Sequence, residues 1–489
     1  MSFVTAASMR LIEETAFQRG VSAEALMDLA GKGIARRLIS QFPISGHAIA
    51  YVGKGNNGGD ALVALHFLRS EGWKVSIRAA YPEEKWGELP RKKLRDLRED
   101  PCDGIDPTHG SPMLLLDGLL GIGGCGPLRP ELADLCAEMH LLREQWGAVI
   151  AAMDIPSGLN ADSGESSGVI ADLTLTVGVP KAGLSTRSGI EHSGRIILVP
   201  LLDLPQPDSA GLRFFCPESF PSLLKPRGHE FHKGNAGRIA LLAGSPGMTG
   251  AAVLSAKAAL RAGAGLITLH VGKDFLPTLT SSFPPEIMVR VSDNPVSEAF
   301  ASNADVLVIG PGTGNWSTSS QTKLLENLAT DTRPMVLDAD ALNIIANNDR
   351  HDLLASHHLI TPHPGEFSRL APDIDQSDRE SAVKSFTKRY PCTLLLKGAR
   401  TLVGNSGSRI CFNPTGHAGM ASGGQGDVLS GVAGALLAQN LDLPDAASLA
   451  AWLCGAAGER SLRNGPFTTA SDILSQLGPA MQDWQQRRR

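Results

Sequence analysis

The chain has 489 residues, a formal net charge of −5, 42% apolar residues and 19% charged residues. This length and composition predict two globular domains of roughly 200 to 270 residues each. The absence of a basic excess argues against nucleic-acid or membrane-surface binding, and no apolar run reaches the roughly 18 residues that a membrane span needs. Seven cysteines without a CxxC pair, and no signal-peptide pattern, favour reduced thiols in a cytoplasmic protein over disulfides or zinc.

The first half opens with helices and then a strand that ends in a glycine-rich loop. Residues 5–40 have the apolar spacing of two helices, separated at Gly20. A buried type of strand is predicted at His47–Val52, followed by the loop GKGNNGGD and a helix over Ala61–Ser70. The loop is not a Walker A motif, because no Gly-Lys-Ser/Thr closes it. Residues Asn56–Asp60 could alternatively form only a tight turn, since Asn-Gly pairs favour turns.

Two further predicted strands end in acidic and glycine-containing loops. Met113–Leu116 runs into Asp117 and the loop Gly121–Pro127, and Val149–Met153 runs into Asp154-Ile155-Pro156-Ser157-Gly158. We expect these loops to share one edge of a parallel sheet, where ligands bind. One carboxylate there could act as an acid or base. Another, with asparagine and serine oxygens, could hold a hard cation.

These motifs resemble a known domain. GNNGGD, the Asp117–Gly124 stretch and DIPSG, with MRLIEETA and LMDLAGKG before them, are similar to the YjeF N-terminal domain of the NAD(P)H-hydrate epimerases over about residues 5–210. The resemblance implies a Rossmann-like three-layer α/β/α fold. It implies that Asn57, Asp117 and Ser157 coordinate K⁺ and that Asp154 is the acid or base at the hydrated C6 carbon.

The same resemblance places the hydrated nicotinamide nucleotide on Asp154 and on two loops. Their residues are Asn56, Asn57, Gly58, Gly59, Asp60, Gly121, Ile122, Gly123, Gly124, Cys125, Gly126 and Pro127. The chain departs from the usual family pattern at two neighbouring positions, where Ala61 replaces glycine and Ile122 replaces threonine. These departures concern affinity more than chemistry.

A proline-rich stretch indicates the join between the two domains. Its prolines are Pro205, Pro207, Pro217, Pro221 and Pro226. We expect the boundary near residues 212–222, which gives domains of 1–215 and 216–489. Beyond the join, strand-like runs alternate with helical stretches, which predicts a second α/β domain with a mostly parallel sheet. Its predicted strands are Arg238–Ala243, Leu266–Val271, Asp305–Ile309, Met335–Leu337, Leu359–Ile360, Leu394–Leu396 and Thr401–Val403.

The stretch Asn413–Gly431, NPTGHAGMASGGQGDVLSG, is predicted to form a strand end, a glycine-rich loop and a helix. Gly423, Gly424 and Gly426 would let successive backbone N–H groups point at one anion beside the helix N-terminus. Asp427 falls in the first turn of that helix. Its carboxylate could be a general base toward a hydroxyl that attacks phosphorus, or it could simply cap the helix.

The second half resembles another known family. GPGTG, LDADAL, TPHPGE, KGA-x-T and GGQGD occur in this order, and about residues 225–485 are similar to the ADP-dependent NAD(P)H-hydrate dehydratases, which are ribokinase-like. The resemblance implies that the hydrate binds on Ala251, Gly312, His363 and Asp427. It implies that ADP binds on Lys397, Gly398, Ala399, Arg400, Thr401 and Gly426.

Three of these motif residues have a second interpretation. His363, between two prolines, could be an inert loop histidine. Asp338 and Asp340 could lie near Mg²⁺ or could cap a helix at Ala341. For Lys397 and Thr401 the chemistry agrees with the resemblance, because a lysine neutralises phosphate charge and a hydroxyl suits a phosphate oxygen.

Together the two resemblances imply a bifunctional repair enzyme, expected as a homo-oligomer, that acts on the hydrates of NADH and NADPH. One half would interconvert the R and S epimers, and the other would dehydrate the S epimer with ADP, giving AMP and phosphate. Two alternatives stay open: a ribokinase-like kinase for a vitamin precursor, and a first half that only binds protein or RNA. Asp60, Asp117 and Asp154 argue against the second alternative.

Overall fold

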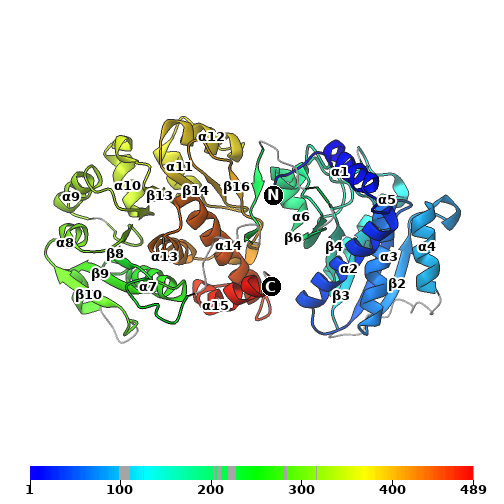
Figure 1. Ribbon diagram of the computed structural model, residues 1–489, viewed down its shortest axis with the longest axis horizontal. Coiled ribbons are helices and arrows are strands. Elements are labelled where there is room, and N and C mark those ends of the chain that lie inside the picture. The colour runs from blue at the N-terminus through cyan, green and yellow to red at the C-terminus, as the bar shows by residue number, and fades with distance from the viewer. Residues whose placement is uncertain are drawn as a thin grey trace. The chain divides into compact units, whose positions relative to one another are not determined.

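The computed structural model describes residues 1–98, 111–124, 126–201, 204–205, 211–217, 227–278, 283–314 and 316–487. The chain separates into two compact units, Met1–Gly211 and Leu212–Arg489, and each is considered by itself (Figure 1). The predicted boundary at 215/216 falls a few residues after this division. Pro207, Pro221 and Pro226 of the predicted join lie outside the described residues.

The first unit is built on a six-stranded sheet in the order β2-β1-β3-β4-β5-β6, and every neighbouring pair is parallel. The strands are β1 (His47–Val52), β2 (Lys74–Ala79), β3 (Met113–Gly118), β4 (Val149–Met153), β5 (Leu173–Val177) and β6 (Arg195–Val199). The helices are α1 (Ala6–Gln18), α2 (Ala23–Gln41), α3 (Asn56–Ser70), α4 (Glu88–Arg98), α5 (Pro130–Trp146) and α6 (Arg187–Ser193). The predicted opening helices and the predicted strands β1, β3 and β4 are therefore confirmed.

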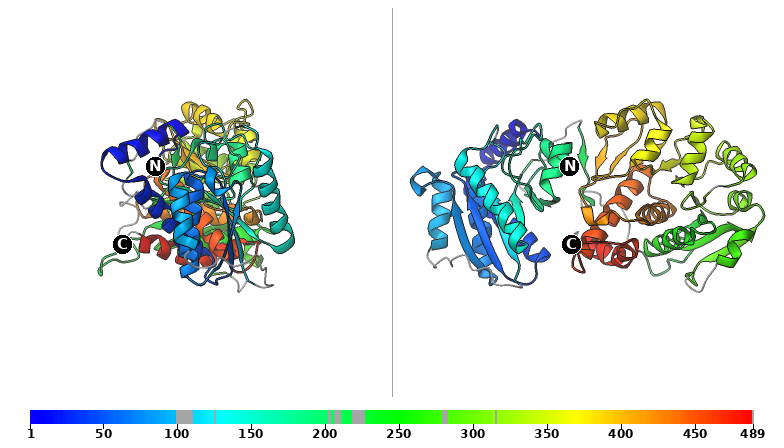
Figure 2. Two further views of the ribbon diagram at one scale, coloured as in Figure 1. Left: turned by 90° about the vertical axis from the view of Figure 1, so that its right-hand side faces the viewer. Right: turned by 180° about the vertical axis from the view of Figure 1, so that it is seen from behind.

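Alternation of side chains along β1 explains the three layers of this unit. Ala48, Ala50 and Val52 belong to the apolar cluster that includes residues of α2 and α3. Ile49 and Tyr51 point to the opposite cluster, which includes residues of α5. A parallel sheet that is apolar on both faces requires a helical layer on each of them, and Figure 2 shows the sheet between its helices.

The second unit contains a ten-stranded sheet in the order β10-β9-β8-β11-β12-β13-β14-β15-β16-β7. Its neighbours are parallel except that β15 runs antiparallel to β14 and β16. The strands are β7 (Arg213–Phe214), β8 (Arg238–Leu242), β9 (Leu266–Gly272), β10 (Met288–Ser292), β11 (Val306–Ile309), β12 (Met335–Leu337), β13 (His358–Ile360), β14 (Thr393–Leu396), β15 (Leu402–Gly404) and β16 (Cys411–Phe412). All seven strands predicted in this half are present. The prediction lacked β7, which is two residues long, and β10, which has no fully buried residue. The strand end predicted at Asn413 corresponds to β16, which ends at Phe412.

Helices cover both faces of this sheet. They are α7 (Thr249–Arg261), α8 (Pro295–Ala301), α9 (Thr318–Leu328), α10 (Asp340–Asn347), α11 (Pro364–Leu370), α12 (Arg379–Arg389), α13 (Gln425–Ala438), α14 (Leu443–Ser461) and α15 (Ala470–Arg487). Residues of α7, α13, α14 and α15 share one apolar cluster with Val306 and Val308 of β11. On the other face, α8 contacts β8 and β9, and α12 contacts β14 and β15.

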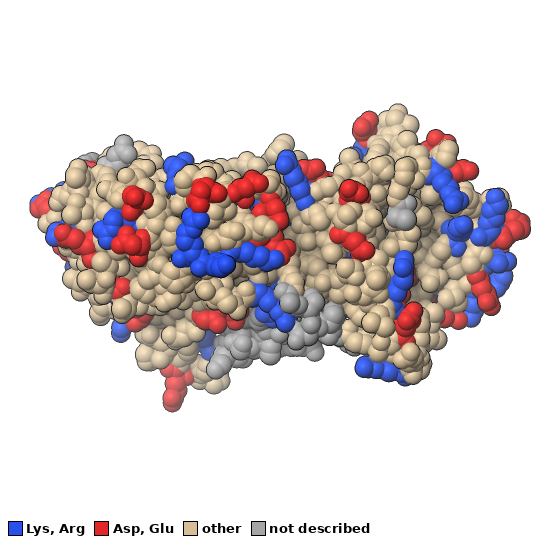
Figure 3. All heavy atoms as spheres, turned by 90° about the horizontal axis from the view of Figure 1, so that it is seen from above, with Lys and Arg blue, Asp and Glu red and all other residues tan. Residues whose placement is uncertain are grey.

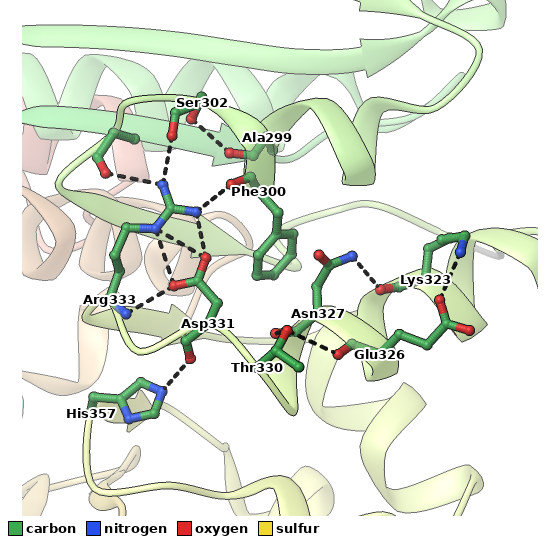
Figure 4. Close-up of polar contacts among 11 residues, drawn as sticks. Ala299, Phe300, Ser302, Lys323, Glu326, Asn327, Thr330, Asp331, Arg333 and His357 are labelled. Carbon is green, nitrogen blue, oxygen red and sulfur yellow. Dashed lines mark hydrogen bonds and ion pairs between the residues drawn. The ribbon is translucent and has the colours of Figure 1, made fainter.

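The amino ends of β11 and β12 are held together by one arginine (Figure 4). The guanidinium of Arg333 donates from Nη1 to the carbonyls of Ser302, at 2.9 Å, and Ala304, at 3.1 Å, and from Nη2 to the carbonyl of Phe300, at 2.6 Å. Its Nε donates to both oxygens of Asp331, at 3.1 and 3.0 Å. The carboxylate of Asp331 neutralises the charge of Arg333, so this pair carries no net charge.

Charged side chains are mixed over the face shown in Figure 3, where acidic and basic groups are interspersed and form no basic field. Among the described helices, none has the length and apolar character needed to cross a membrane.

Candidate active sites

In the first unit, the predicted loop Asn56–Asp60 is the first turn of a helix. α3 begins at Asn56 with Gly55 as N-cap, and the N–H of Gly58 donates to the carbonyl of Gly55 at 3.0 Å. A Cβ on Gly58 would lie 2.6 Å from the carbonyl oxygen of Gly53. Glycine therefore lets the helix start close against the end of β1. The predicted start of the helix at Ala61 and the tight-turn alternative are both wrong.

Asn57, Asp117 and Ser157, which come from three segments, meet in one hydrogen-bonded network. Ser157 Oγ donates to Asp117 Oδ1 at 2.5 Å, and Ser157 N donates to Oδ2 at 2.8 Å. Leu120 N donates to Ser157 Oγ at 2.8 Å, and Asn57 Nδ2 donates to the Leu120 carbonyl at 2.8 Å. Burial raises the pKa of Asp117 to about 6, although the bonds from Ser157 oppose it. The structure thus brings the three predicted cation ligands together.

The donor chemistry of this network fits a hard cation. The carboxylate of Asp117 accepts three hydrogen bonds, while a carboxylate has about four lone-pair positions. Within the described ranges, Asn57 Oδ1 accepts no hydrogen bond. No group of three or more His, Cys, Asp or Glu side chains suited to a metal occurs among the described residues. A cation here would therefore bind amide, hydroxyl and single-carboxylate oxygens, which suits K⁺ better than zinc.

Asp154 lies at the same edge of the sheet, directly after β4, in a strained conformation. Its φ is +69°, which costs energy for a residue other than glycine. Its Oδ1 accepts from Val177 N at 2.9 Å and forms an ion pair with Nζ of Lys181. Lys181 is only 1% exposed, and its Nζ also donates to the Val177 carbonyl at 2.8 Å. The carboxylate of Asp154 is thus fixed at the end of β4.

The carboxyl groups of Asp60 and Glu13 lie near the ion pair of Asp154 and Lys181. Burial raises the pKa of Asp60 well above its ordinary value, and the charge of Asp154 adds to the effect. Burial likewise raises the pKa of Glu13 on α1. The first residues of the chain bring α1 here, because Val4 exchanges hydrogen bonds with the backbone on either side of Lys181, donating to the Pro180 carbonyl at 2.9 Å and accepting from Ala182 N at 2.8 Å.

The second predicted substrate loop of this unit adjoins Asn57. A Cβ on Gly121 would lie 3.3 Å from Asn57 Cβ, and one on Gly123 would lie 4.0 Å from Nη2 of Arg10 on α1. Ile122 packs against the apolar cluster of α2 and α3. Cys125 lies outside the described residues. The two glycine-containing segments therefore share one edge of the sheet.

In the second unit, Asp427 lies in the first turn of α13, as predicted. The helix begins at Gln425, so Gly426 belongs to the helix and not to the preceding loop. The N-cap is Gly424 and no side chain caps the helix, so the alternative in which Asp427 is the N-cap is wrong. In the part of the chain that the structure describes, the carboxylate of Asp427 accepts no hydrogen bond.

The surroundings of Asp427 keep its carboxyl close to protonation near neutral pH. Burial raises the pKa of Asp427 to about 6, with Asp338 and Asp340 adding to the effect and Lys397 opposing it. Lys397 Nζ lies 2.7 Å from Asp338 Oδ1, and Ser430 Oγ donates to Asp338 Oδ2 at 2.7 Å. Burial lowers the pKa of Lys397, but Asp338 and Glu366 outweigh it, so the net change is upward.

Neither Asp338 nor Asp340 caps α10, so the capping alternative is wrong. The N-cap of α10 is Ala339, whose side chain makes no capping bond, and Asp338 Oδ1 accepts from Ala339 N at 2.9 Å, which is not an N–H group of the helix. The carboxylate of Asp340 instead accepts from Gly314 N at 2.8 Å, in the GPGTG loop after β11. This bond joins the loops after β11 and β12 at the carboxyl edge of the sheet.

His363 has a defined structural role as the N-cap of α11. Its Nδ1 accepts from Gly365 N at 3.0 Å and from Glu366 N at 3.3 Å, which places the ring proton on Nε2. Glu366 Oε2 accepts from His363 N at 2.8 Å and lies 3.6 Å from Lys397 Nζ. The imidazole remains 52% exposed. The histidine is therefore a cap beside Lys397 with one ring edge open to solvent.

The two remaining hydrate-binding candidates touch each other. A Cβ on Gly312 would lie 2.6 Å from the Cβ of Ala251, and the φ of Gly312 is +59°. Only glycine allows the loop after β11 to approach the N-terminal turn of α7 in this way.

The loop Lys397–Thr401, hereafter the 397–401 loop, joins β14 to β15. Gly398 has a φ of +142°, and Thr401 Oγ1 donates to the Gly398 carbonyl at 3.3 Å. Gly398 and Ala399 are exposed. Among the described residues, the N–H groups of Gly398, Ala399 and Thr401 meet no acceptor. A Cβ on Gly426 would lie 3.3 Å from Lys397 Nζ. The first turn of α13, the lysine and this loop thus form one region suited to a phosphate group.

Comparison with known proteins identifies the family. One family model, described as NAD(P)H-hydrate dehydratase, matches residues 239–479, and another, described as YjeF-related protein N-terminus, matches residues 23–183. The chain is 34% identical to the bifunctional NAD(P)H-hydrate repair enzyme Nnr of Coxiella burnetii, over 94% of each chain. It is 35% identical to the enzyme of the same name from Escherichia coli, over 91% of this chain and 87% of that one. This chain belongs to the bifunctional NAD(P)H-hydrate repair enzymes.

Within this repair-enzyme family, the second unit has the ribokinase-like fold that the sequence predicts. A ribokinase-like superfamily protein from Enterococcus faecalis V583 superposes with a TM-score of 0.51 and 24% identity, over 57% of this chain and 99% of that one. The predicted pair of α/β domains, Rossmann-like and ribokinase-like, is confirmed.

Three charged residues of these sites are absent from the predicted set of this repair enzyme: Lys181 and Glu13 in the first unit and Glu366 in the second. Lys181 is the only charged residue in the stretch TLTVGVPKAGL, and an isolated lysine among apolar residues is a signal that could have revealed it. Glu13 lies in MRLIEETA, where its place on a helix gave no indication of a partner far along the chain. Glu366 lies in the TPHPGE motif, but its contact with Lys397 depends on the fold.

Proposed function

We propose that this repair enzyme restores hydrated NADH and NADPH with one site in each unit. The first unit interconverts the R and S epimers, and the second dehydrates the S epimer with ADP, giving AMP and phosphate. One observation carries the second assignment above all. Asp427 offers a desolvated carboxylate, without a hydrogen bond among the described residues, at the uncapped N-terminus of α13. A general base beside an anion site is the arrangement that phosphoryl transfer to a hydroxyl requires.

In the dehydration, Asp427 accepts the proton of the C6 hydroxyl. The hydroxyl oxygen then attacks the β-phosphorus of ADP, and AMP leaves. The C6–O bond of the phosphate ester then breaks, C5 loses a proton, and the double bond of the dihydronicotinamide is restored. Lys397 and the N–H groups of the first turn of α13 stabilise the charge on the transferred group, while the N–H groups of the 397–401 loop hold the diphosphate equally before and during the transfer. Ala251, Gly312 and His363 would line the hydrate side of this site.

Mg²⁺ that accompanies the nucleotide would neutralise part of the phosphate charge. Asp340 is the residue that fits it best, because its carboxylate accepts one hydrogen bond among the described residues. The carboxylate of Asp338 is engaged by both Lys397 and Ser430.

In the epimerisation, Asp154 takes the proton of the C6 hydroxyl as the C6–N1 bond opens to an aldehyde, and it returns the proton when N1 adds back to the opposite face of C6, which inverts the configuration. Lys181 holds this carboxylate in place. K⁺, held by Asn57, Asp117 and Ser157, would offset the charge of Asp117 and order the loops. The glycines of the two adjoining segments leave room for the nucleotide.

The test is incubation of the full chain with mixed hydrate epimers and ADP, with recovery of NADH absorbance and phosphate release followed together. Inorganic phosphate in step with NADH supports repair. A stable phosphate ester without NADH would indicate a kinase and refute the proposal. The alternatives of a vitamin kinase and of a protein- or RNA-binding module gain no support from the family match. The cytoplasmic location and the homo-oligomer stay predictions.

A further inference from the structure

An arginine on the neighbouring helix α12 donates hydrogen bonds to the backbone carbonyls of the 397–401 loop. Arg379 is the first residue of α12. Its Nη1 donates to the carbonyls of Ala399, at 2.7 Å, and Arg400, at 3.1 Å. Its Nη2 donates to those of Leu396, at 2.9 Å, and Lys397, at 3.1 Å. One guanidinium therefore donates hydrogen bonds to four backbone carbonyls within five consecutive residues.

These hydrogen bonds from Arg379 determine the direction of the N–H groups of the loop. In a trans peptide the C=O of one residue and the N–H of the next point in opposite directions. The carbonyls of Lys397 and Arg400 point toward Arg379, so the N–H groups of Gly398 and Thr401 point away from it. These N–H groups meet no acceptor among the described residues. They remain available to an anion on the side away from Arg379.

Gly398 is the loop residue that allows Arg379 to approach this closely. Its φ is +142°, and a Cβ at this position would lie 3.2 Å from Nη2 and 3.4 Å from Cζ of Arg379. Glycine thus allows both the backbone turn and the contact with the guanidinium.

The charge of Arg379 also distinguishes it from the arginine at the opposite edge of the sheet. Arg333 grips three carbonyls in the same manner but is paired with Asp331 (Figure 4). Across the described ranges, no carboxylate lies within ion-pair distance of Arg379. The guanidinium therefore lies at the carbonyl ends of the loop peptides, and their N–H ends face the proposed phosphate site. A diphosphate bound there would complement the positive charge of Arg379.

We infer that Arg379 is the positioning residue that holds the 397–401 loop in its anion-binding form and so sets the affinity for the diphosphate of ADP. The inference rests on the proposed use of ADP by the second unit. Arg379 does not itself touch the reacting atoms, so it governs nucleotide binding and leaves the chemical step unaltered once the nucleotide is bound.

The test is the full-length Arg379→Lys variant, which keeps the charge but loses the planar fork. We expect the KM for ADP in S-epimer dehydration to rise on the order of tenfold, because several charge-assisted bonds lose their geometry. The kcat at saturating ADP should stay within about threefold of the parent, because a loss of binding that is equal in the ground state and the transition state raises KM and leaves kcat unchanged. Calorimetric titration with ADP should give the same loss of affinity.

Two matched arginine variants serve as controls. Arg333→Lys loosens a clamp of the same kind at the opposite edge of the sheet, and Arg389→Lys changes the last residue of α12, which pairs with Asp373 at the surface. Both should leave the KM for ADP unchanged, although Arg333→Lys should lower the Tm. If Arg379→Lys lowers only the Tm as well, the residue is merely structural and the inference fails.

Two further variants keep the inference separable from the proposed function. Gly398→Ala disturbs the same contact from the loop side and should also raise the KM for ADP, so it replaces Arg379→Lys if that variant does not fold. Thr401→Val removes a proposed phosphate contact without touching Arg379. If Thr401→Val raises the KM but Arg379→Lys and Gly398→Ala do not, only this inference is overturned. If none of the three alters ADP affinity, ADP binds elsewhere and the proposed function fails with it.

Discussion

The burial of Asp427 predicts that the residue proposed as catalytic base weakens the fold that carries it. Its pKa of about 6, against an ordinary 3.8, means that the folded protein favours the protonated form. Between these two values the folded state binds more protons than the unfolded state, so stability falls as the pH rises. At about 1.36 kcal/mol for each pKa unit, the ionised carboxylate costs about 3 kcal/mol at pH 7.

Asp427→Asn should therefore be more stable than the parent at pH 7 by up to about 3 kcal/mol, while losing S-epimer dehydration by about 10²- to 10⁴-fold. The stability gain should shrink as the pH falls below about 6 and vanish below about pH 4. Scanning calorimetry of the full chain measures it, with about 2 to 4 °C of Tm expected for each kcal/mol in a unit of this size. In the parent, the dehydration rate should fall below about pH 6, because the base must be ionised.

Two other aspartates provide the controls for this experiment. Asp349→Asn changes a side chain that is 97% exposed and should leave stability within about 0.5 kcal/mol of the parent. Asp338→Asn should destabilise at pH 7, because Lys397 then lacks its nearest carboxylate. The reasoning is refuted if Asp427→Asn is less stable than the parent at pH 7, or if its advantage does not depend on pH. Dehydration at the parent rate would remove Asp427 from the mechanism.

Three further substitutions test the division of labour. Lys397→Ala should raise the ADP requirement of dehydration at fixed Mg²⁺, and an unchanged requirement would place the nucleotide elsewhere. Asp154→Ala should leave S-epimer dehydration intact, while the R epimer is consumed only as fast as it epimerises spontaneously; chromatography resolves the two species, and equal loss of both activities would indicate one composite site. Lys181→Met should slow epimerisation and spare dehydration, because Asp154 loses the partner that fixes its carboxylate; an unaltered epimerisation rate in a folded variant would leave Lys181 with a purely structural role.

Local sequence patterns were sufficient for most of the strands and for the edge of the sheet at which the sites lie. The apolar runs that became β1, β3 and β4 fix the direction of each strand, and Asp117 and Asp154 come at their ends. Parallel strands bring such ends together whatever the loops between them do. This explains why residues as distant as Asn57 and Ser157 could be assigned to one site.

Contacts that depend on packing could not be predicted in this way. The pair of Lys397 and Asp338 joins residues at the ends of two strands separated by β13 in the sheet order, and no spacing in the sequence encodes it. The early start of α3 shows the opposite error. The intrinsic preference of Asn and Gly favours a turn, but close packing against the end of β1 overrides it, and the same glycines then serve a helix.

The position of the 397–401 loop within a hairpin limits how this repair enzyme could change its nucleotide. Leu396 is paired with Leu402 across the antiparallel strands β14 and β15, so the loop has a fixed number of residues between paired positions. Inserting or deleting one residue would shift β15 by one position and turn its buried side chains to the opposite face. The width of the proposed phosphate-binding turn is thus tied to the register of the sheet. Altered nucleotide preference should arise here through substitutions, and a variant loop of different length should compromise folding before it alters specificity.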